Sequence, residues 1–120
     1  MKGRKQVSEQ LSKDKIVEII KSNSNNELLN GLKIGLAGSY SRDEQSKNSD
    51  IDIVIDGDST RVQAGEFIQS LFEKETDILW LELLKEEDKE LDKICIEACG
   101  EPNKESVYKT IIKDVRWIKQ

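Results

Sequence analysis

The chain has 120 residues, enough for a single hydrophobic core, and we expect one domain that covers residues 1–120. Its 24 acidic and 19 basic residues give a net charge of -5 and a pI near 4.9, and no basic cluster is present to neutralise a phosphate backbone, which argues against extended nucleic acid as a ligand. No apolar run approaches the roughly 20 residues that span a bilayer, and the basic start MKGRKQ leads into a polar segment, so we expect a cytoplasmic protein without a membrane partner.

The first half of the chain predicts one long helix and two strands. Between residues 8 and 26, apolar side chains recur at approximately helical spacing until Ser and Asn residues end the pattern (Leu11, Ile16, Ile19 and Ile20). A short helical turn is expected at ELLNG. LKIGLAG has the length and apolarity of a buried strand, and IDIVI is β-branched and alternating, which makes it the clearest strand in the chain.

The second half predicts three helices and two strands. After the turn signal DGD, Ser59 or Thr60 is placed to cap a helix with apolar residues at i, i+3, i+4, i+7 and i+8 (Ala64, Phe67, Ile68, Leu71 and Phe72). TDILWLELL predicts another buried strand, and KEEDKELDKICIEACGEPN predicts a helix that stops at Gly100 and Pro102. The last segment predicts a helix through about Lys113 and then a short strand at VRWI, with one continuous helix as the rival interpretation.

This order of elements predicts an α/β (α+β) fold in which a mixed β-sheet is flanked by helices. Cys95 and Cys99 lie four residues apart in one of the predicted helices, and a helical stripe of Leu91, Ile94 and Ala98 accompanies them. The chain contains no histidine, so the two cysteines lack the companions of a zinc site. We therefore interpret both as reduced thiols buried in the core.

Two aspartates are set into the clearest strand. Successive side chains of a strand point to opposite faces, so Asp50 and Asp52 share one face with Cα atoms about 6.6 Å apart, while Ile51, Ile53 and Ile55 point to the other. Two carboxylates at this spacing repel each other unless a cation or a shared proton compensates, and a hard cation such as Mg²⁺ takes oxygen ligands. The pair is therefore a candidate metal clamp, with a solvated acidic strand face as the alternative.

A glycine-serine step precedes this pair. Gly38 ends the earlier apolar strand, and Ser39 follows at the entrance to a polar turn or short helix. Glycine lets a phosphate approach the backbone, and amides at a helix N-terminus point their positive ends toward it. The arrangement predicts a phosphate cradle opposite metal-binding carboxylates, with an ordinary turn as the alternative. Tyr40 is expected at a partly exposed position of this loop.

The segment GLAGSYSRDEQSKNSDIDIVID resembles the signature of the DNA polymerase β-like nucleotidyltransferase superfamily, in particular its minimal nucleotidyltransferases. An apolar strand, Gly-Ser, a polar loop and then Ser-Asp-Ile-Asp occur in the same order and spacing. The likeness is strongest over residues 32–55 and weaker through Asp77 to ESVYKTIIKD. It implies the polymerase β-like fold, a nucleoside triphosphate held by Gly38 and Ser39, and Mg²⁺ or Mn²⁺ on Asp50 and Asp52.

The resemblance also implies a third carboxylate from a neighbouring strand, which completes the catalytic and metal-binding set. Asp77 is our candidate; Glu82 is the alternative, although it lies near the strand end and, by parity, on the opposite face. Arg42 and Ser49 are implied as further nucleotide-binding residues. Family loops commonly read Gly-Ser, any residue, Ala, Arg, Gly, whereas this chain has Ser41 and Asp43 where small residues are usual. Asp43 adds negative charge beside the phosphate site, so nucleotide affinity is the property that this departure affects most.

The activity that the resemblance implies is transfer of a nucleoside monophosphate, AMP from ATP in the leading interpretation, to an acceptor hydroxyl, with pyrophosphate leaving. Two metal ions would stabilise the attacking and departing oxygens. Minimal members of the family are often paired with a helical HEPN-domain protein and act as antitoxins, so such a partner and a homo- or hetero-oligomer are implied. Two alternatives remain: nucleotidylation of a small hydroxylated molecule, and a non-catalytic nucleotide- or protein-binding module with the same fold.

Overall fold

The computed structural model describes residues 11–120; the start MKGRKQ and residues 8–10 of the first predicted helix lie outside the described residues. That residues 1–120 form one domain stays a prediction. The helices and strands are α1 (Lys13–Ser22), η1 (Glu27–Leu29), β1 (Lys33–Ala37), α2 (Gly38–Ser41), β2 (Ile51–Asp56), α3 (Val62–Ser70), β3 (Thr76–Trp80), α4 (Leu81–Cys99), α5 (Val107–Asp114) and β4 (Arg116–Lys119). No helix within residues 11–120 is both long enough and apolar enough to cross a membrane.

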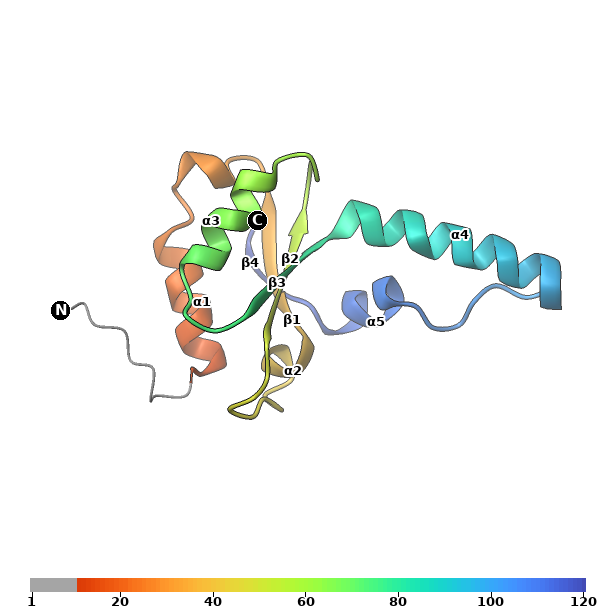
Figure 1. Ribbon diagram of the computed structural model, residues 1–120, viewed down its shortest axis with the longest axis horizontal. Helices are drawn as coiled ribbons and strands as arrows, with labels where there is room; N and C mark the ends of the chain where they lie inside the picture. Colours follow the sequence, from red (N-terminus) through yellow and green to blue (C-terminus); the bar gives the residue numbers. More distant parts are fainter. Residues whose placement is uncertain (1–10) are drawn as a thin grey trace.

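Four strands form one mixed sheet in the order β3-β2-β1-β4 (Figure 1). Strand β1 is antiparallel to both β2 and β4, whereas β2 and β3 are parallel. A parallel pair needs a crossover connection, and α3 supplies it. The predicted mixed sheet flanked by helices is therefore confirmed. The predicted short terminal strand is confirmed as well: it is β4, and it follows α5, whose N-cap is Ser106.

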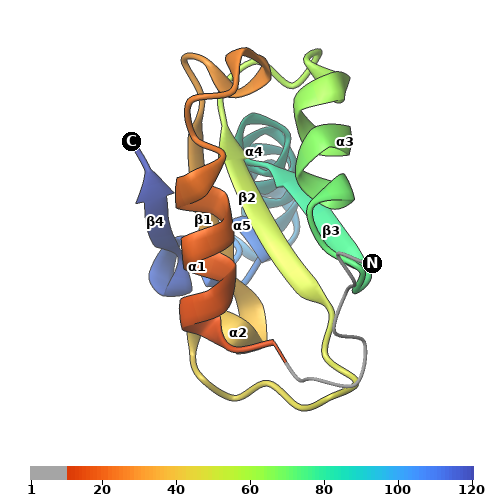
Figure 2. The ribbon, with the colours of Figure 1, turned by 90° about the vertical axis from the view of Figure 1, so that its left-hand side faces the viewer.

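The alternation along β2 sends its side chains into two separate cores. Its isoleucines are fully buried against α1 and α3, where Ile16 and Ile68 pack on them (Ile51, Ile53 and Ile55). Val54 faces the other side of the sheet and packs with Leu81 and Ile111 from α4 and α5. Figure 2 shows α1 and α3 in front of the sheet and α4 behind it. Asp52 has the parity of Val54, so the candidate acids lie on the α4 and α5 face.

The strand predicted at TDILWLELL is too long, because β3 ends at Trp80 and α4 begins at Leu81. Apolar residues run through this junction without a break, so the sequence offers no change of period at the point where the strand stops. Helix α4 then continues for 19 residues and ends at Gly100, whose φ of 80° is the left-handed conformation expected of a glycine cap. The predicted stop at Gly100 is confirmed.

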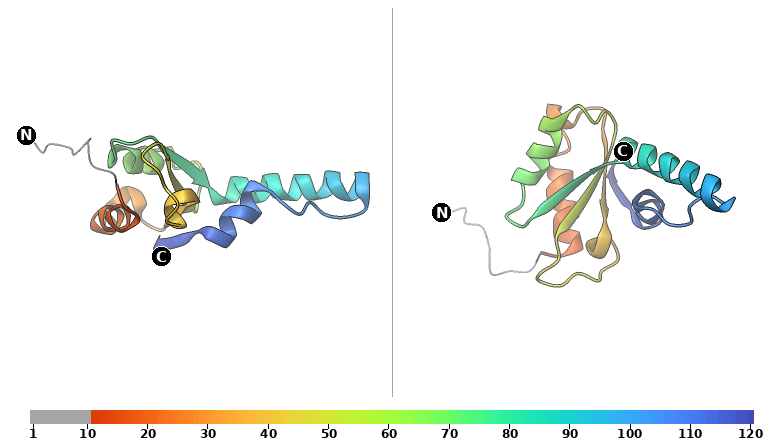
Figure 3. Two further views of the ribbon diagram at one scale, coloured as in Figure 1. Left: turned by 90° about the horizontal axis from the view of Figure 1, so that it is seen from below. Right: turned by 45° about the vertical axis from the view of Figure 1, so that its right-hand side comes forward.

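The prediction that both cysteines lie in the core was wrong. Cys95 is half-buried and Cys99 is exposed, and both are free thiols. Helix α4 projects away from the sheet, so its distal half has only α5 and the connecting segment to pack against (Figure 3). The apolar stripe that accompanies the cysteines is consequently exposed as well, with Leu91 and Ile94 on the surface.

The predicted cap of α3 was also wrong. The helix begins at Val62 after Arg61, and no side chain caps it. The hydroxyl groups of both predicted caps are engaged elsewhere: Ser59 Oγ donates to Glu82 and Thr60 Oγ1 donates to Asp58. These bonds hold the β2–α3 turn to itself and to the first turn of α4.

Candidate active site

Three aspartates meet at the end of the sheet where β2 and β3 begin. The parallel register pairs Asp52 of β2 with Asp77 of β3, and strands so paired lie about 4.8 Å apart, so the two side chains emerge on the same face. Asp50 immediately precedes β2, two residues from Asp52, and lies close enough for its charge to raise the pKa of Asp52. Asp50 and Asp77 are exposed and Asp52 is half-buried. The structure thus places the three predicted acids at the same end of the sheet.

The glycine of the loop lies directly against this group. Ala37 of β1 pairs with Asp52, so the step into α2 starts beside the Asp52 carboxylate. A Cβ added at Gly38 would lie 2.3 Å from Asp52 Oδ2, and Gly38 has a φ of +71°, which L side chains rarely adopt. Glycine is therefore required here both for its backbone conformation and for the close approach to Asp52.

The environment of Asp52 favours its protonated form. Burial raises the pKa of Asp52 above its ordinary value of 3.8, and the charges of Asp77 and Asp50 raise it further, while Arg42 lowers it. Within the described residues, no three Asp, Glu, Cys or His side chains are gathered closely enough to hold one metal ion. The charges of Asp77 and Asp50 therefore repel the Asp52 carboxylate, and Arg42 compensates this repulsion only in part.

This repulsion predicts a pH-dependent gain of stability in Asp52→Asn. Between the unfolded pKa of Asp52 and its raised folded pKa, the folded chain binds more protons than the unfolded chain, so this group's contribution to stability falls as pH rises. We expect the thermal midpoint of Asp52→Asn minus that of the wild type, measured in chelator, to increase from about pH 3.5 to pH 7. A difference that is constant or decreases over this range would contradict the raised pKa.

Glu82, the alternative third acid, lies elsewhere. It occupies the first turn of α4, beyond the end of β3, so the parity argument made for a strand residue does not apply to it. Its Oε2 accepts hydrogen bonds from Ser59 Oγ at 2.7 Å and from the Ser59 amide at 3.3 Å. Ser59 follows the far end of β2, so Glu82 is engaged at the opposite end of the strand from Asp52.

Arg42 lies close enough to the acids to lower the pKa of Asp52, but its guanidinium is already engaged. Nε donates to Glu44 and Nη1 donates to Asp114, each at 2.9 Å. The Ser41 hydroxyl also donates to the backbone carbonyl of Asp114. Asp114 therefore fastens the loop after β1 to the end of α5. Sequence reasoning missed this residue, because more than 70 positions separate it from the loop and no spacing signal connects them.

The other predicted binding residues frame the acids. Ser39 is half-buried in α2, and its carbonyl accepts from the Glu44 amide at 2.8 Å, which closes the loop. Ser49 immediately precedes Asp50, and its Oγ accepts from the Ser46 amide at 2.9 Å. Tyr40, expected to be partly exposed, is fully buried in the core under α1, so its ring is not available to a nucleotide.

The backbone conformation at Asp43 is one that favours glycine, the residue that family loops commonly have at this position. Its φ is +59°, the left-handed conformation that costs a side chain about 1–2 kcal/mol, although Asp and Asn tolerate it better than most residues. Its carboxylate also forms an ion pair with Lys13 of α1, Nζ to Oδ2 3.3 Å. The negative charge that the sequence adds beside the loop is therefore partly compensated by α1.

The strain at this position can be measured with two substitutions that both remove the charge. Asp43→Asn keeps a side chain that tolerates positive φ, so we expect a loss of no more than about 0.5 kcal/mol in the free energy of unfolding. Asp43→Ala is expected to lose about 1 kcal/mol more, because alanine does not. Urea denaturation at matched salt provides the comparison, and equal losses would show that the ion pair with Lys13 matters and the backbone conformation does not.

Comparisons with known proteins bear on this arrangement. A comparison with curated proteins finds no match. Among solved structures, one similar chain comes from a crystal structure of a mutant of the toxin-antitoxin pair MntA-HpeT; the two chains are 18% identical, with a TM-score of 0.47, and the likeness covers 90% of this chain and 72% of that chain. The model of the family described as nucleotidyltransferase domain matches residues 13–118. This match spans both the loop and all three aspartates, and it shows that the chain belongs to the nucleotidyltransferase domain family.

Proposed function

We propose that this nucleotidyltransferase moves a nucleoside monophosphate from a triphosphate to an acceptor hydroxyl at the site formed by Asp50, Asp52 and Asp77. The observation that carries the proposal is the register that pairs Asp52 with Asp77 close to Asp50, with Gly38 against the Asp52 carboxylate. Exposed Asp50 and Asp77 leave the group accessible to a ligand from solvent. The alternative of a merely solvated acidic strand face does not account for a half-buried aspartate beside two others.

The donor set fits the divalent metal that enzymes of this family generally use. Three carboxylates that repel one another are the hard oxygen ligands that Mg²⁺ or Mn²⁺ prefers. Since the side chains are not already gathered, binding would draw Asp50, Asp52 and Asp77 together and relieve their repulsion. When bound, such a cation stabilises negative charge on the transferred phosphate and on the leaving pyrophosphate.

The loop residues supply the triphosphate side of the proposal. Gly38 and Ser39 stand next to Asp52, so a phosphate on their backbone would lie within reach of the acids. Ser49 supports the turn that leads into Asp50. Glu44 and Asp114 accept from two of the five N–H groups of Arg42, so a phosphate could bind the remaining three or replace one of the carboxylates.

The finer assignments are ATP as donor, with AMP transferred, and a helical HEPN-domain protein as partner, with this chain as its antitoxin. They rest on the sequence resemblance to minimal nucleotidyltransferases and on the net charge of -5, which makes nucleic acid an unfavourable acceptor. The acceptor hydroxyl in this assignment belongs to the partner protein.

Metal dependence tests the proposal directly. We expect ATP to bind measurably better in Mg²⁺ than in chelator, because the carboxylates repel the triphosphate until a cation compensates them. Calorimetry with each of the four nucleoside triphosphates measures this and identifies the preferred base. Transfer is then followed with the α-labelled nucleotide and the co-expressed partner. Equal affinity with and without Mg²⁺ would remove the metal clamp, and absence of metal-dependent pyrophosphate release would remove the transfer reaction.

A further inference from the structure

A second surface, whose lining includes none of the three aspartates, lies between α4 and α5. The two helices form an arm that projects from the sheet (Figure 3). They line an open groove with a volume of about 470 Å³. Apolar side chains from both helices line it: Leu84, Leu91 and Ile94 of α4, and Val107 and Tyr108 of α5. Three of these are largely exposed, Ile94 at 59%, Val107 at 55% and Leu91 at 42%. We call this surface the arm groove.

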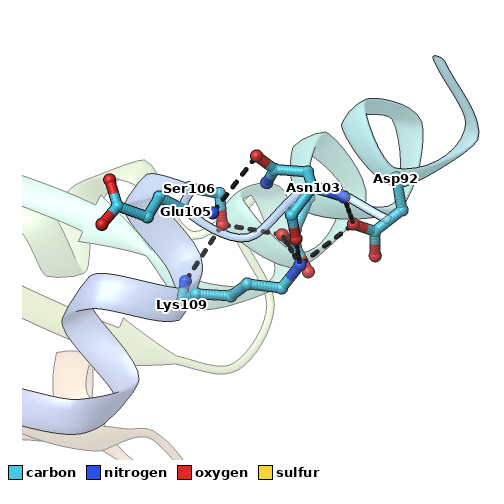
Figure 4. A network of polar contacts seen from close by, with 6 residues as sticks. Asp92, Asn103, Glu105, Ser106 and Lys109 are labelled. Atoms are coloured by element: carbon cyan, nitrogen blue, oxygen red, sulfur yellow. Dashed lines mark hydrogen bonds and ion pairs between the residues drawn. The ribbon is translucent and has the colours of Figure 1, made fainter. Parts of the chain in front are cut away.

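A polar network fixes the two sides of the arm groove relative to each other (Figure 4). Ser106 Oγ donates to the buried carboxylate of Asp88 at 2.7 Å while it accepts from the Lys109 amide and so caps α5. Lys109 Nζ donates to Asp92 at 2.9 Å and also binds the Asn103 carbonyl. These contacts join α4 to α5 and to the segment that precedes it, so the two sides of the groove are already positioned when a ligand arrives.

The rim of the arm groove is acidic. Glu86, Glu87 and Glu90 line it, no basic residue does, and none of the three glutamates has an ion-pair partner in the described part of the chain. Helix α4 as a whole carries seven acidic residues and three lysines. An apolar floor with unpaired acids on its edge is complementary to an apolar stripe flanked by positive charge.

We propose that the arm groove docks a basic amphipathic helix of a partner protein. A third helix laid between α4 and α5 would bury Leu91, Ile94 and Val107 and place its flanking Lys or Arg side chains against the rim glutamates. The inference deepens the proposed function, because it rests on the proposed role of a partner protein. It does not depend on the proposed catalysis, because docking involves neither the three aspartates nor the loop.

A second copy of this chain is the less favourable occupant. Two arm grooves placed face to face would oppose two sets of unpaired glutamates in a protein of net charge -5. Like charges brought together at an interface cost several kcal/mol. A basic helix instead pairs with the same charges.

Two synthetic peptides test the surface without nucleotide or metal. Each is a labelled 18-residue amphipathic helix with leucines at i, i+3 or i+4, and i+7; one carries lysines on the flanking positions and the other carries glutamates. Fluorescence anisotropy with the full chain is expected to show binding of the lysine peptide in the micromolar range, weakened by salt, and none of the glutamate peptide. Because this assay omits ATP and Mg²⁺, its failure is distinguishable from failure of the catalytic proposal.

Matched variants locate the binding. Ile94→Ser is expected to weaken the lysine peptide at least tenfold, as truncation of a central apolar contact does. Val62→Ser, a residue of α3 that is 58% exposed against 59% for Ile94, is the control and should leave affinity unchanged. Glu87→Gln with Glu90→Gln should lower both affinity and its salt dependence. No binding of the lysine peptide at 0.2 mM, equal binding of both peptides, equal effects of Ile94→Ser and Val62→Ser, or a wild-type dimer that Ile94→Ser dissociates would each overturn the proposal.

Discussion

Asp52→Asn is expected to lower the rate of nucleotidyl transfer by at least about two orders of magnitude while the thermal midpoint stays equal or rises. The amide keeps the shape of the carboxylate but removes the negative charge that lies nearest the centre of the acid group. The folded chain meanwhile loses a charge that burial and the repulsion of Asp77 and Asp50 disfavour, the causes that raise the pKa of Asp52. Loss of activity therefore cannot be ascribed to unfolding. Initial rates in Mg²⁺ and melting curves in chelator supply the two measurements.

Two further variants decide whether Asp77 or Glu82 is the third carboxylate. Asp77→Asn is expected to behave like Asp52→Asn, because the two residues are register partners. Glu82→Gln is expected to retain turnover and to lose roughly 1 kcal/mol of stability, because its hydrogen bonds with Ser59 weaken. Asp56→Asn, on the same strand face but four residues from Asp52, is the control for a change of charge on β2.

Each possible outcome of these substitutions rules out one assignment. Full turnover in Asp52→Asn would refute the catalytic role of Asp50 and Asp52. Normal turnover in Asp77→Asn together with loss in Glu82→Gln would move the third carboxylate to α4. Equal losses in Asp52→Asn and Asp56→Asn would show that general charge on the strand matters rather than the acid group.

The parts of the fold that sequence reasoning predicted well are those that local periodicity determines. The alternation of IDIVID places Asp52 on the face opposite the isoleucines whatever the rest of the chain does, and β2 has that alternation. Gly100 and the terminal strand were likewise identified from local signals. Placement of Asp77 beside Asp52 needed one more step, a parallel crossover through α3, and the family resemblance supplied it.

The errors occurred where tertiary contacts decide. TDILWLELL is apolar from Ile78 to Leu81, so the change from β3 to α4 at Leu81 is not marked by any change of pattern. The stripe on α4 has the spacing of a core face, yet the helix extends beyond the sheet and leaves Ile94 exposed. Asp114 reaches Arg42 across more than 70 residues, and only the folded chain brings them together. A helical period therefore predicts that a face will be covered without predicting what covers it, and on α4 the uncovered part is the arm groove.

Gly38→Ala is expected to reduce turnover by about tenfold to a hundredfold, because it displaces the Asp52 carboxylate. The added Cβ would lie 2.3 Å from Asp52 Oδ2, so the carboxylate must turn away from the loop. A carboxylate is the mobile end of its side chain and turns at small cost. The loss of stability should therefore come mainly from the φ of +71°, at about 1 kcal/mol.

Gly100→Ala is the matched control for this prediction. Gly100 has a φ of +80°, but a Cβ added there would meet no atom within 4 Å. The same backbone cost of about 1 kcal/mol is expected, with full turnover. Calorimetric titration with Mg²⁺ alone then separates two ways of losing activity. Weaker Mg²⁺ binding in Gly38→Ala means that Asp52 has moved, whereas unchanged Mg²⁺ binding with a raised KM for the nucleotide would place the role of Gly38 in the approach of phosphate to the backbone. Unchanged turnover in Gly38→Ala would contradict both, and with them the assignment of this loop to the active site.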